Sequence, residues 1–109
     1  MSAPKQTRAK RATPDEVFYK LRLFVAGATP QSTRAILHAR RFCEERLAGR
    51  YQLKVIDIYQ RPALARQEQI VAVPTLVKKL PEPLRRLVGD LSNTERVAMG
   101  LDLAVNGEG

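Results

Sequence analysis

The 109-residue chain has a single cysteine and no tryptophan, and this scarcity narrows the chemistry available to it. Cys43 has no second thiol with which to form an internal disulfide. Together with His38, the one histidine, it also leaves too few ligands for a zinc site. We therefore expect no metal, no other cofactor and no enzymatic activity.

The chain also lacks long hydrophobic runs. No apolar stretch approaches the ~20 residues of a membrane span, and no apolar segment follows the basic N-terminus to complete a signal peptide. We expect a cytoplasmic protein without membrane contact. Residues 1–16 show no apolar periodicity and predict a flexible basic tail. A single domain is expected over residues 17–105, and a short flexible end over 106–109.

Acidic residues are the minority: the chain has 11 Asp and Glu against 19 Lys and Arg, which gives a net charge of +8. Such an excess is common in nucleic-acid-binding proteins, because cations neutralise phosphates. Here the charge is spread along the whole chain, and no basic-aromatic stacking motif accompanies it. We therefore disfavour nucleic acid as a partner; an acidic protein surface serves equally well.

The first half of the domain predicts a strand, a helix and a second strand. Residues 17–25 alternate between two faces, which is typical of a strand. Thr29 and Pro30 suit the N-cap and first position of a helix, and Gly49 ends it. The β-branched and aromatic residues of 51–59 predict a second strand, parallel to the first because a helical crossover joins them.

An apolar stripe on this helix predicts which of its side chains enter the core. Its members recur at spacings of three and four. They are Ala35, Ile36, Ala39, Phe42, Cys43 and Leu47. Cys43 is therefore expected in the core as an inert thiol, whereas His38 lies off the stripe and is expected in solvent.

The second half allows two interpretations. A short helix is expected over residues 62–69, and residues 75–80 and 84–88 predict a hairpin around Pro81-Glu-Pro83. The apolar residues of the second hairpin strand fit a helix face equally well. Periodicity alone leaves this choice open.

The C-terminal segment is ambiguous in the same way. Ser92 and Glu95 are spaced as a capping box, which predicts a helix through Leu101. Apolar residues also alternate from Met99 to Val105, as they would in a strand.

Two segments resemble a thioredoxin-like domain, Val25-Ala-Gly-Ala-Thr-Pro-Gln-Ser32 and Val73-Pro-Thr-Leu76. A thioredoxin-type enzyme carries C-x-x-C at the first strand-to-helix turn, because one thiolate attacks and the second resolves the mixed disulfide. No cysteine lies in that turn here. The scaffold therefore indicates binding rather than catalysis; the isomer of the Val73-Pro74 bond is left open.

Five blocks, in order, resemble the KaiB family of clock proteins. They are Leu21-Arg-Leu-Phe-Val-Ala-Gly-Ala-Thr-Pro30, Leu53-Lys-Val-Ile-Asp57, Val73-Pro-Thr-Leu76, Arg85-Arg-Leu-Val-Gly-Asp-Leu-Ser92 and Gly100-Leu-Asp-Leu103. The resemblance implies an α/β protein with two forms: an active thioredoxin-like form, βαβαββα, and a ground-state form, βαββααβ. It also implies that two packings of the second half differ by a few kcal/mol, which would explain its double periodicity.

The same resemblance implies partners and sites. The expected partner is a KaiC-like hexameric ATPase whose phosphorylation the protein modulates, with a KaiA-like protein or a clock histidine kinase as further candidates. A homotetramer or homodimer is expected in the resting form. The expected partner-binding residues are Arg34, Lys54, Gln69, Arg85 and Arg86, with Lys54 assigned to a KaiA-like partner. The expected fold-switch residues are Val73, Pro74, Gly100 and Asp102.

Two features depart from the family pattern. Gln69 stands where relatives often carry lysine, and the chain lacks their acidic tail. A different partner specificity would follow. The alternative function is a thioredoxin-like adaptor that does not switch, resembling the sensor domain of a clock histidine kinase.

Overall fold

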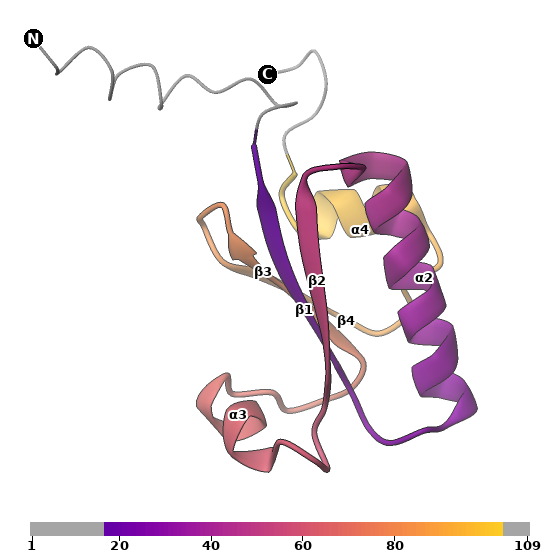
Figure 1. The fold of residues 1–109 in the computed structure, drawn as a ribbon, viewed down its shortest axis with the longest axis vertical. Coiled ribbons are helices and arrows are strands. Elements are labelled where there is room, and N and C mark those ends of the chain that lie inside the picture. Colours follow the sequence, from indigo (N-terminus) through magenta and orange to yellow (C-terminus); the bar gives the residue numbers. More distant parts are fainter. Residues whose placement is uncertain (1–16, 104–109) are drawn as a thin grey trace, which may run out of the picture.

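The computed structural model describes residues 17–103 as a sheet of four strands with helices on both faces (Figure 1). Its elements follow in the order βαβαββα. They are β1 (Tyr19–Val25), α2 (Pro30–Leu47), β2 (Tyr51–Asp57), α3 (Pro62–Gln67), β3 (Thr75–Leu80), β4 (Arg85–Val88) and α4 (Thr94–Gly100). The predicted tail at 1–16, residues 104–105 of the predicted domain and the predicted end at 106–109 lie outside the described residues.

The first half forms the predicted parallel crossover. β1 and β2 pair in parallel from Tyr19 opposite Tyr51 to Val25 opposite Asp57. Thr29 is extended, and its Oγ1 accepts a hydrogen bond from the Ser32 N–H at 3.0 Å, so it is the N-cap that the sequence predicts.

The second half adds an antiparallel hairpin to the other side of β1. The sheet order is β2-β1-β3-β4, with β3 antiparallel to both of its neighbours. Since β3 and β4 are strands and residues 94–100 are helical, the structure has the expected thioredoxin-like form. The hairpin prediction is thereby confirmed, as is the helix predicted after Ser92 and through Leu101, which the structure has over Thr94–Gly100.

Two apolar clusters lie on opposite faces of the sheet. The larger joins the inward stripe of α2, including Phe42 and Cys43, to β1 and to Leu101 after α4. The smaller consists of Phe24, Ile56 and Val77, against which partly buried residues of α3 and its flanks pack. Figure 1 accordingly shows α2 and α3 on opposite sides of the sheet.

Several predicted boundaries are wrong by about two residues. The first strand begins at Tyr19, the second ends at Asp57, and α3 ends at Gln67. The chain leaves the sheet after Asp57 because this side chain accepts hydrogen bonds from the N–H groups of Gly27 and Tyr59, at 3.0 and 2.9 Å.

The predicted capping box is also wrong. Asn93, not Ser92, caps α4: its Oδ1 accepts from the N–H groups of Glu95 and Arg96, each at 3.0 Å. Ser92 instead bonds to the carboxylate of Asp90 through its N–H and its hydroxyl, at 2.9 and 3.1 Å. The helix therefore starts one residue later than a Ser92 cap would place it.

Two further observations complete the fold. The Val73-Pro74 peptide bond, whose isomer the sequence left open, is cis. Among the helices of residues 17–103, none has the length and apolar character needed to cross a membrane.

Candidate functional site

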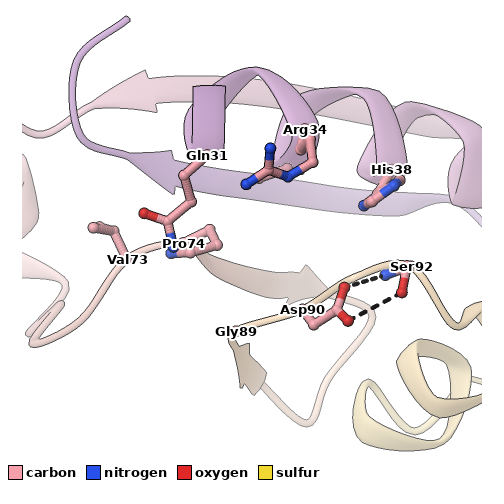
Figure 2. Close-up of a pocket in the computed structure, with 9 residues that line it drawn as sticks. Gln31, Arg34, His38, Val73, Pro74, Gly89, Asp90 and Ser92 are labelled. Carbon is pink, nitrogen blue, oxygen red and sulfur yellow. Dashed lines mark hydrogen bonds between the residues drawn. The ribbon is translucent and has the colours of Figure 1, made fainter. Parts of the chain in front are cut away.

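A groove of about 480 Å³ lies between the first half of α2 and two loops of the second half. Its lining residues are Gln31, Arg34, Ala35, His38, Val73, Pro74, Gly89, Asp90 and Ser92. Figure 2 shows Arg34 and His38 on the side of α2 that faces the Asp90 loop, and Gln31 extending toward Pro74. The groove thus joins one predicted partner-binding residue, Arg34, to two predicted fold-switch residues, Val73 and Pro74.

The strand-to-helix turn beside this groove is held by hydrogen bonds instead of carrying thiols. The Thr29 hydroxyl donates to Ser32 Oγ at 3.0 Å, and the Ser32 hydroxyl donates to the Ala26 carbonyl at 3.2 Å. Gly27 has a φ of +71°, a conformation that favours glycine. The turn therefore presents hydroxyl groups that are already engaged, an arrangement suited to a fixed binding wall.

The opposite wall carries a negative charge. Bonds from the N–H and hydroxyl of Ser92 hold the pKa of Asp90 below its ordinary value, with smaller contributions from His38 and Arg96. Arg34 and Asp90 therefore give the groove walls of opposite charge, and a partner that inserts between them must match both. No pattern in the sequence pointed to Asp90 as a site residue, and His38, which was expected in solvent, is half-buried in the groove wall.

A second cluster fastens the end of α3 to the sheet. Glu68 accepts from Arg22 Nη1 at 2.7 Å and from Lys79 Nζ at 2.9 Å, which joins α3 to β1 and β3. Arg86 on β4 donates to the Gln69 carbonyl at 2.8 Å and also to the Glu68 carbonyl. Gln69 itself has a φ of +58°, a conformation uncommon outside glycine. Gln69 and Arg86, both predicted as partner-binding, are therefore neighbours in a structured corner.

Arg85 and Arg86, although consecutive, lie on opposite faces of β4, because side chains alternate along a strand. Arg86 faces α3, whereas Arg85 Nη2 lies 3.7 Å from the Asp102 carboxylate at the end of α4. The two arginines therefore cannot belong to one continuous patch in this form. The sequence left open whether these residues form a strand or a helix, and only a strand points consecutive side chains to opposite faces.

The two remaining residues that were predicted to act in a fold switch, Gly100 and Asp102, lie together at the end of α4. Gly100 is its last residue, and a Cβ there would come within 3.0 Å of Leu87 Cδ1 on β4. Asp102 follows with a φ of +55°, in the left-handed region that only a few residue types adopt readily. The C-terminal end of α4 therefore combines a close approach with a strained backbone.

Lys54 stands apart from all other predicted site residues. It is exposed on β2, the edge strand farthest from β4. Lys78 on β3, which was not predicted as a site residue, is 1% exposed and lies in the sheet between Leu21 and Arg85. Burial lowers the pKa of Lys78, while Asp102 opposes this effect and Arg85 adds to it. A Lys-Lys pair in the sequence gave no signal that one member would be buried.

Cys43 occupies the core position that its stripe predicts. It is fully buried, and burial raises the pKa of its thiol to about 12, with the charge of Glu44 adding to the effect. A neutral, inaccessible thiol is a poor nucleophile. Within residues 17–103, no three His, Cys, Asp or Glu side chains are grouped so that they could hold a metal ion.

Comparison with known proteins places this geometry in a family. The family model for the KaiB domain matches residues 22–103. The circadian clock oscillator protein KaiB of Thermostichus vulcanus is 52% identical over 85 residues, covering 78% of this chain and 79% of the relative. A protein of the same name from Prochlorococcus marinus is 53% identical over 85 residues, covering 78% and 71%.

Solved structures agree on the fold. The N-terminal domain of SasA from Synechococcus elongatus superposes with a TM-score of 0.63 at 26% identity, over 76% of this chain and 78% of that one. Mitochondrial thioredoxin 3 of Saccharomyces cerevisiae gives 0.62 at 15% identity, over 91% and 88%, which supports the thioredoxin-like fold alone. From the family match and the identity to the two clock proteins, we conclude that this chain belongs to the KaiB family.

Proposed function

We propose that this chain is a regulatory clock protein that binds a KaiC-like hexameric ATPase and modulates its phosphorylation state. The observation that carries the proposal is the match to the KaiB domain over residues 22–103, which spans nearly every described element. A regulatory rather than enzymatic role agrees with a strand-to-helix turn without cysteine and with a buried Cys43.

We further propose that the second half of the domain rearranges, so that the described form is the one competent to bind the ATPase. The βαβαββα order supports this assignment, because it is the order that the family resemblance gives to the active form. The alternative order, βαββααβ, would use the strand-like alternation after Met99. A partner must prefer one form by ~5.5 kcal/mol to move the equilibrium from 1:99 to 99:1. In the resting form we expect a homotetramer or a homodimer.

Arg34, Gln69, Arg85 and Arg86 are proposed to contact the ATPase. Arg34 lies in the groove, and Gln69 with Arg86 forms the corner at the end of α3. Arg85 lies on the other face of β4, so it would contact the ATPase at a separate place, beside Asp102. Val73 and Pro74 are proposed as the hinge of the rearrangement, since they join α3 to the hairpin.

Lys54 is proposed to contact a KaiA-like partner at the edge of the sheet. β2 has a neighbour on one side only, so the backbone groups of its free side can pair with a strand from another protein. An acidic segment would suit this edge because Lys54 is exposed there.

Co-elution with a KaiC-like hexamer tests the main proposal. After prolonged incubation with ATP, the chain should elute with the hexamer in size-exclusion chromatography; the incubation allows for slow refolding. Arg34→Glu should weaken co-elution, whereas Arg40→Glu, an equal charge change on α2 outside the groove, should not. Absence of co-elution by the unmodified chain would disprove binding, and equal loss in both variants would disprove the role of the groove.

A second candidate is a thioredoxin-like adaptor that does not switch. The similarity to the SasA domain favours it, since that domain shares the fold at 26% identity. NMR of the free chain separates the two candidates. A non-switching adaptor gives a single set of signals with βαβαββα secondary structure, whereas a switching protein gives a second set or the other order.

A further inference from the structure

The sheet face that carries α3 is covered over only part of its length. Phe24, Ile56 and Val77 are buried there beneath α3. Farther along the same face, toward the start of β1, Lys20 and Lys54 are exposed. One end of this face is thus a small core, and the other is an open, polar surface.

The open end is hollowed and lined by cations from three strands. A cavity of about 330 Å³ lies there. Its lining residues are Lys20, Leu21, Arg22, Gln52, Lys54, Lys79 and Leu80. Four of these seven residues carry a positive charge, and none is acidic. The volume falls within the range of small-molecule sites, which begins at about 300 Å³.

Only two of the four cations have a carboxylate partner, and it is the same one. Glu68 pairs with Arg22 and Lys79, at 2.7 and 2.9 Å, and its side chain is only 13% exposed. Within residues 17–103, neither Lys20 nor Lys54 forms an ion pair or a side-chain hydrogen bond. Four cations and one anion leave three positive charges around the cavity.

The register brings these like charges close together. Arg22 is the direct partner of Lys54 across β1 and β2. Like charges on neighbouring strands repel, and Glu68, which pairs with Arg22, forms no ion pair with Lys54. The described residues supply no second anion at this place.

We propose that this cavity binds a soluble oligophosphate, a compound with two or more linked phosphate groups. Linked phosphates concentrate several negative charges in a small volume, and lysine and arginine donate charge-assisted hydrogen bonds to their oxygens. A hollow lined from three strands suits such a compact anion, whereas an extended acidic peptide would pair along the free edge of β2. The site shares Lys54 with the edge proposed for a KaiA-like partner, but binding of the anion needs no partner protein and is measured on this chain alone.

Titration calorimetry with inorganic tripolyphosphate, at low ionic strength, tests the proposal on the full chain. We expect binding at least about tenfold tighter than that of monophosphate at the same ionic strength, because linked phosphates contact several cations at once. The double variant Lys20→Gln/Lys54→Gln should weaken tripolyphosphate binding at least about tenfold. Gln52→Lys, which adds a cation to the same cavity, should strengthen it several-fold.

Arg40→Gln/Arg46→Gln is the matched control, because it removes two exposed charges from α2 on the opposite side of the sheet. It should change affinity less than about twofold, and circular dichroism should show all variants folded. Equal weakening in the control would overturn the proposal by revealing attraction to net charge alone. So would undetectable tripolyphosphate binding, or tighter binding of a glutamate-rich peptide that depends on the same two lysines.

Discussion

The two halves of the domain are held by different kinds of interaction. In β1 five of seven residues are buried, and α2 buries six of its side chains against that strand and its neighbours. In β4 no residue is buried, and α4 buries only Val97 within its own length. The contrast lies between β1 with α2 and β4 with α4, since β3 in the second half also buries four of its six residues. β1 and α2 are therefore held mainly by apolar packing, which needs no particular partner geometry.

Polar contacts carry more of the second half. Glu68 and Arg86 tie α3 to the sheet, Asn93 caps α4, and Asp102 approaches Arg85. Partly exposed ion pairs contribute little, at most about 1 kcal/mol each, because water competes for both charges. The comparison indicates that α4 and β4 detach from the rest of the domain at a lower free energy than β1 and α2 do.

Matched leucine truncations should give the largest effect. Leu23 in β1 and Leu101 after α4 are both 0% exposed. We expect Leu23→Ala to lower the free energy of unfolding by about 4–5 kcal/mol, and Leu101→Ala by about 2–3 kcal/mol, because α4 and β4, which bury few residues of their own, can shift to fill part of the cavity. Urea unfolding measures both values, and equal losses would break the comparison.

Alkaline pH should weaken the first half through Cys43. The ordinary pKa of this thiol is 9.0, and burial raises it to about 12 in the folded chain. Above the ordinary value only the unfolded chain loses the proton, so stability falls as pH rises through this interval, by up to about 1.4 kcal/mol per pH unit. In Cys43→Ala the free energy of unfolding, measured by urea at a series of pH values, should fall less steeply as pH rises. Identical slopes in the two chains would show that Cys43 does not contribute to the pH dependence.

Thiol labelling should separate the two halves kinetically. Cys43 should react with a disulfide reagent at least about a hundredfold more slowly than in the unfolded chain, because the core must open first. In a Cys43→Ala background, Val97→Cys should label at least about tenfold faster than Cys43, since opening of the second half alone exposes it. The same rate at both positions would mean that the domain opens as one unit.

The cap of α4 should contribute about 1 kcal/mol. Asn93→Ala removes the acceptor of two N–H groups and should lower the free energy of unfolding by about that amount. Ser92→Ala is the control, and should cost less than about 0.5 kcal/mol because its side chain bonds only to an exposed carboxylate. If thermal unfolding shows a larger loss of stability for Ser92→Ala than for Asn93→Ala, then Ser92 and not Asn93 is the cap of α4.

Gly100→Ala should have the smallest effect. Alanine is a better helix former by up to about 1 kcal/mol, but its Cβ would lie 3.0 Å from Leu87 Cδ1, so part of the gain is offset. We expect the described form to gain less than about 1 kcal/mol, as measured by urea unfolding. The gain should increase in a Leu87→Ala background, and an unchanged gain would show that the close approach is harmless.

Local sequence patterns predicted which segments are helices and strands better than they predicted where each element ends or which side chains it buries. The apolar stripe of α2 and the alternation of β1 repeat several times, so one residue that does not fit the pattern does not change the prediction. The spacing of Ser92 and Glu95 favoured Ser92 as the cap, but Asn93 is an equally good cap residue and holds that position in the structure. The choice follows from tertiary contacts, because Leu91 is buried and Asp90 binds Ser92.

The sequence by itself determined the family, the thioredoxin-like scaffold and the inert core position of Cys43, because each depends on residue types at short, regular spacings. Only the tertiary structure decided that Arg85 and Arg86 face apart, that Lys78 is buried, and that Lys20 and Lys54 share a cavity. The first depends on residues 85–88 forming a strand and not a helix, and the other two depend on strand register between distant segments. Spacing along the chain does not encode register, since it is fixed only when the sheet assembles.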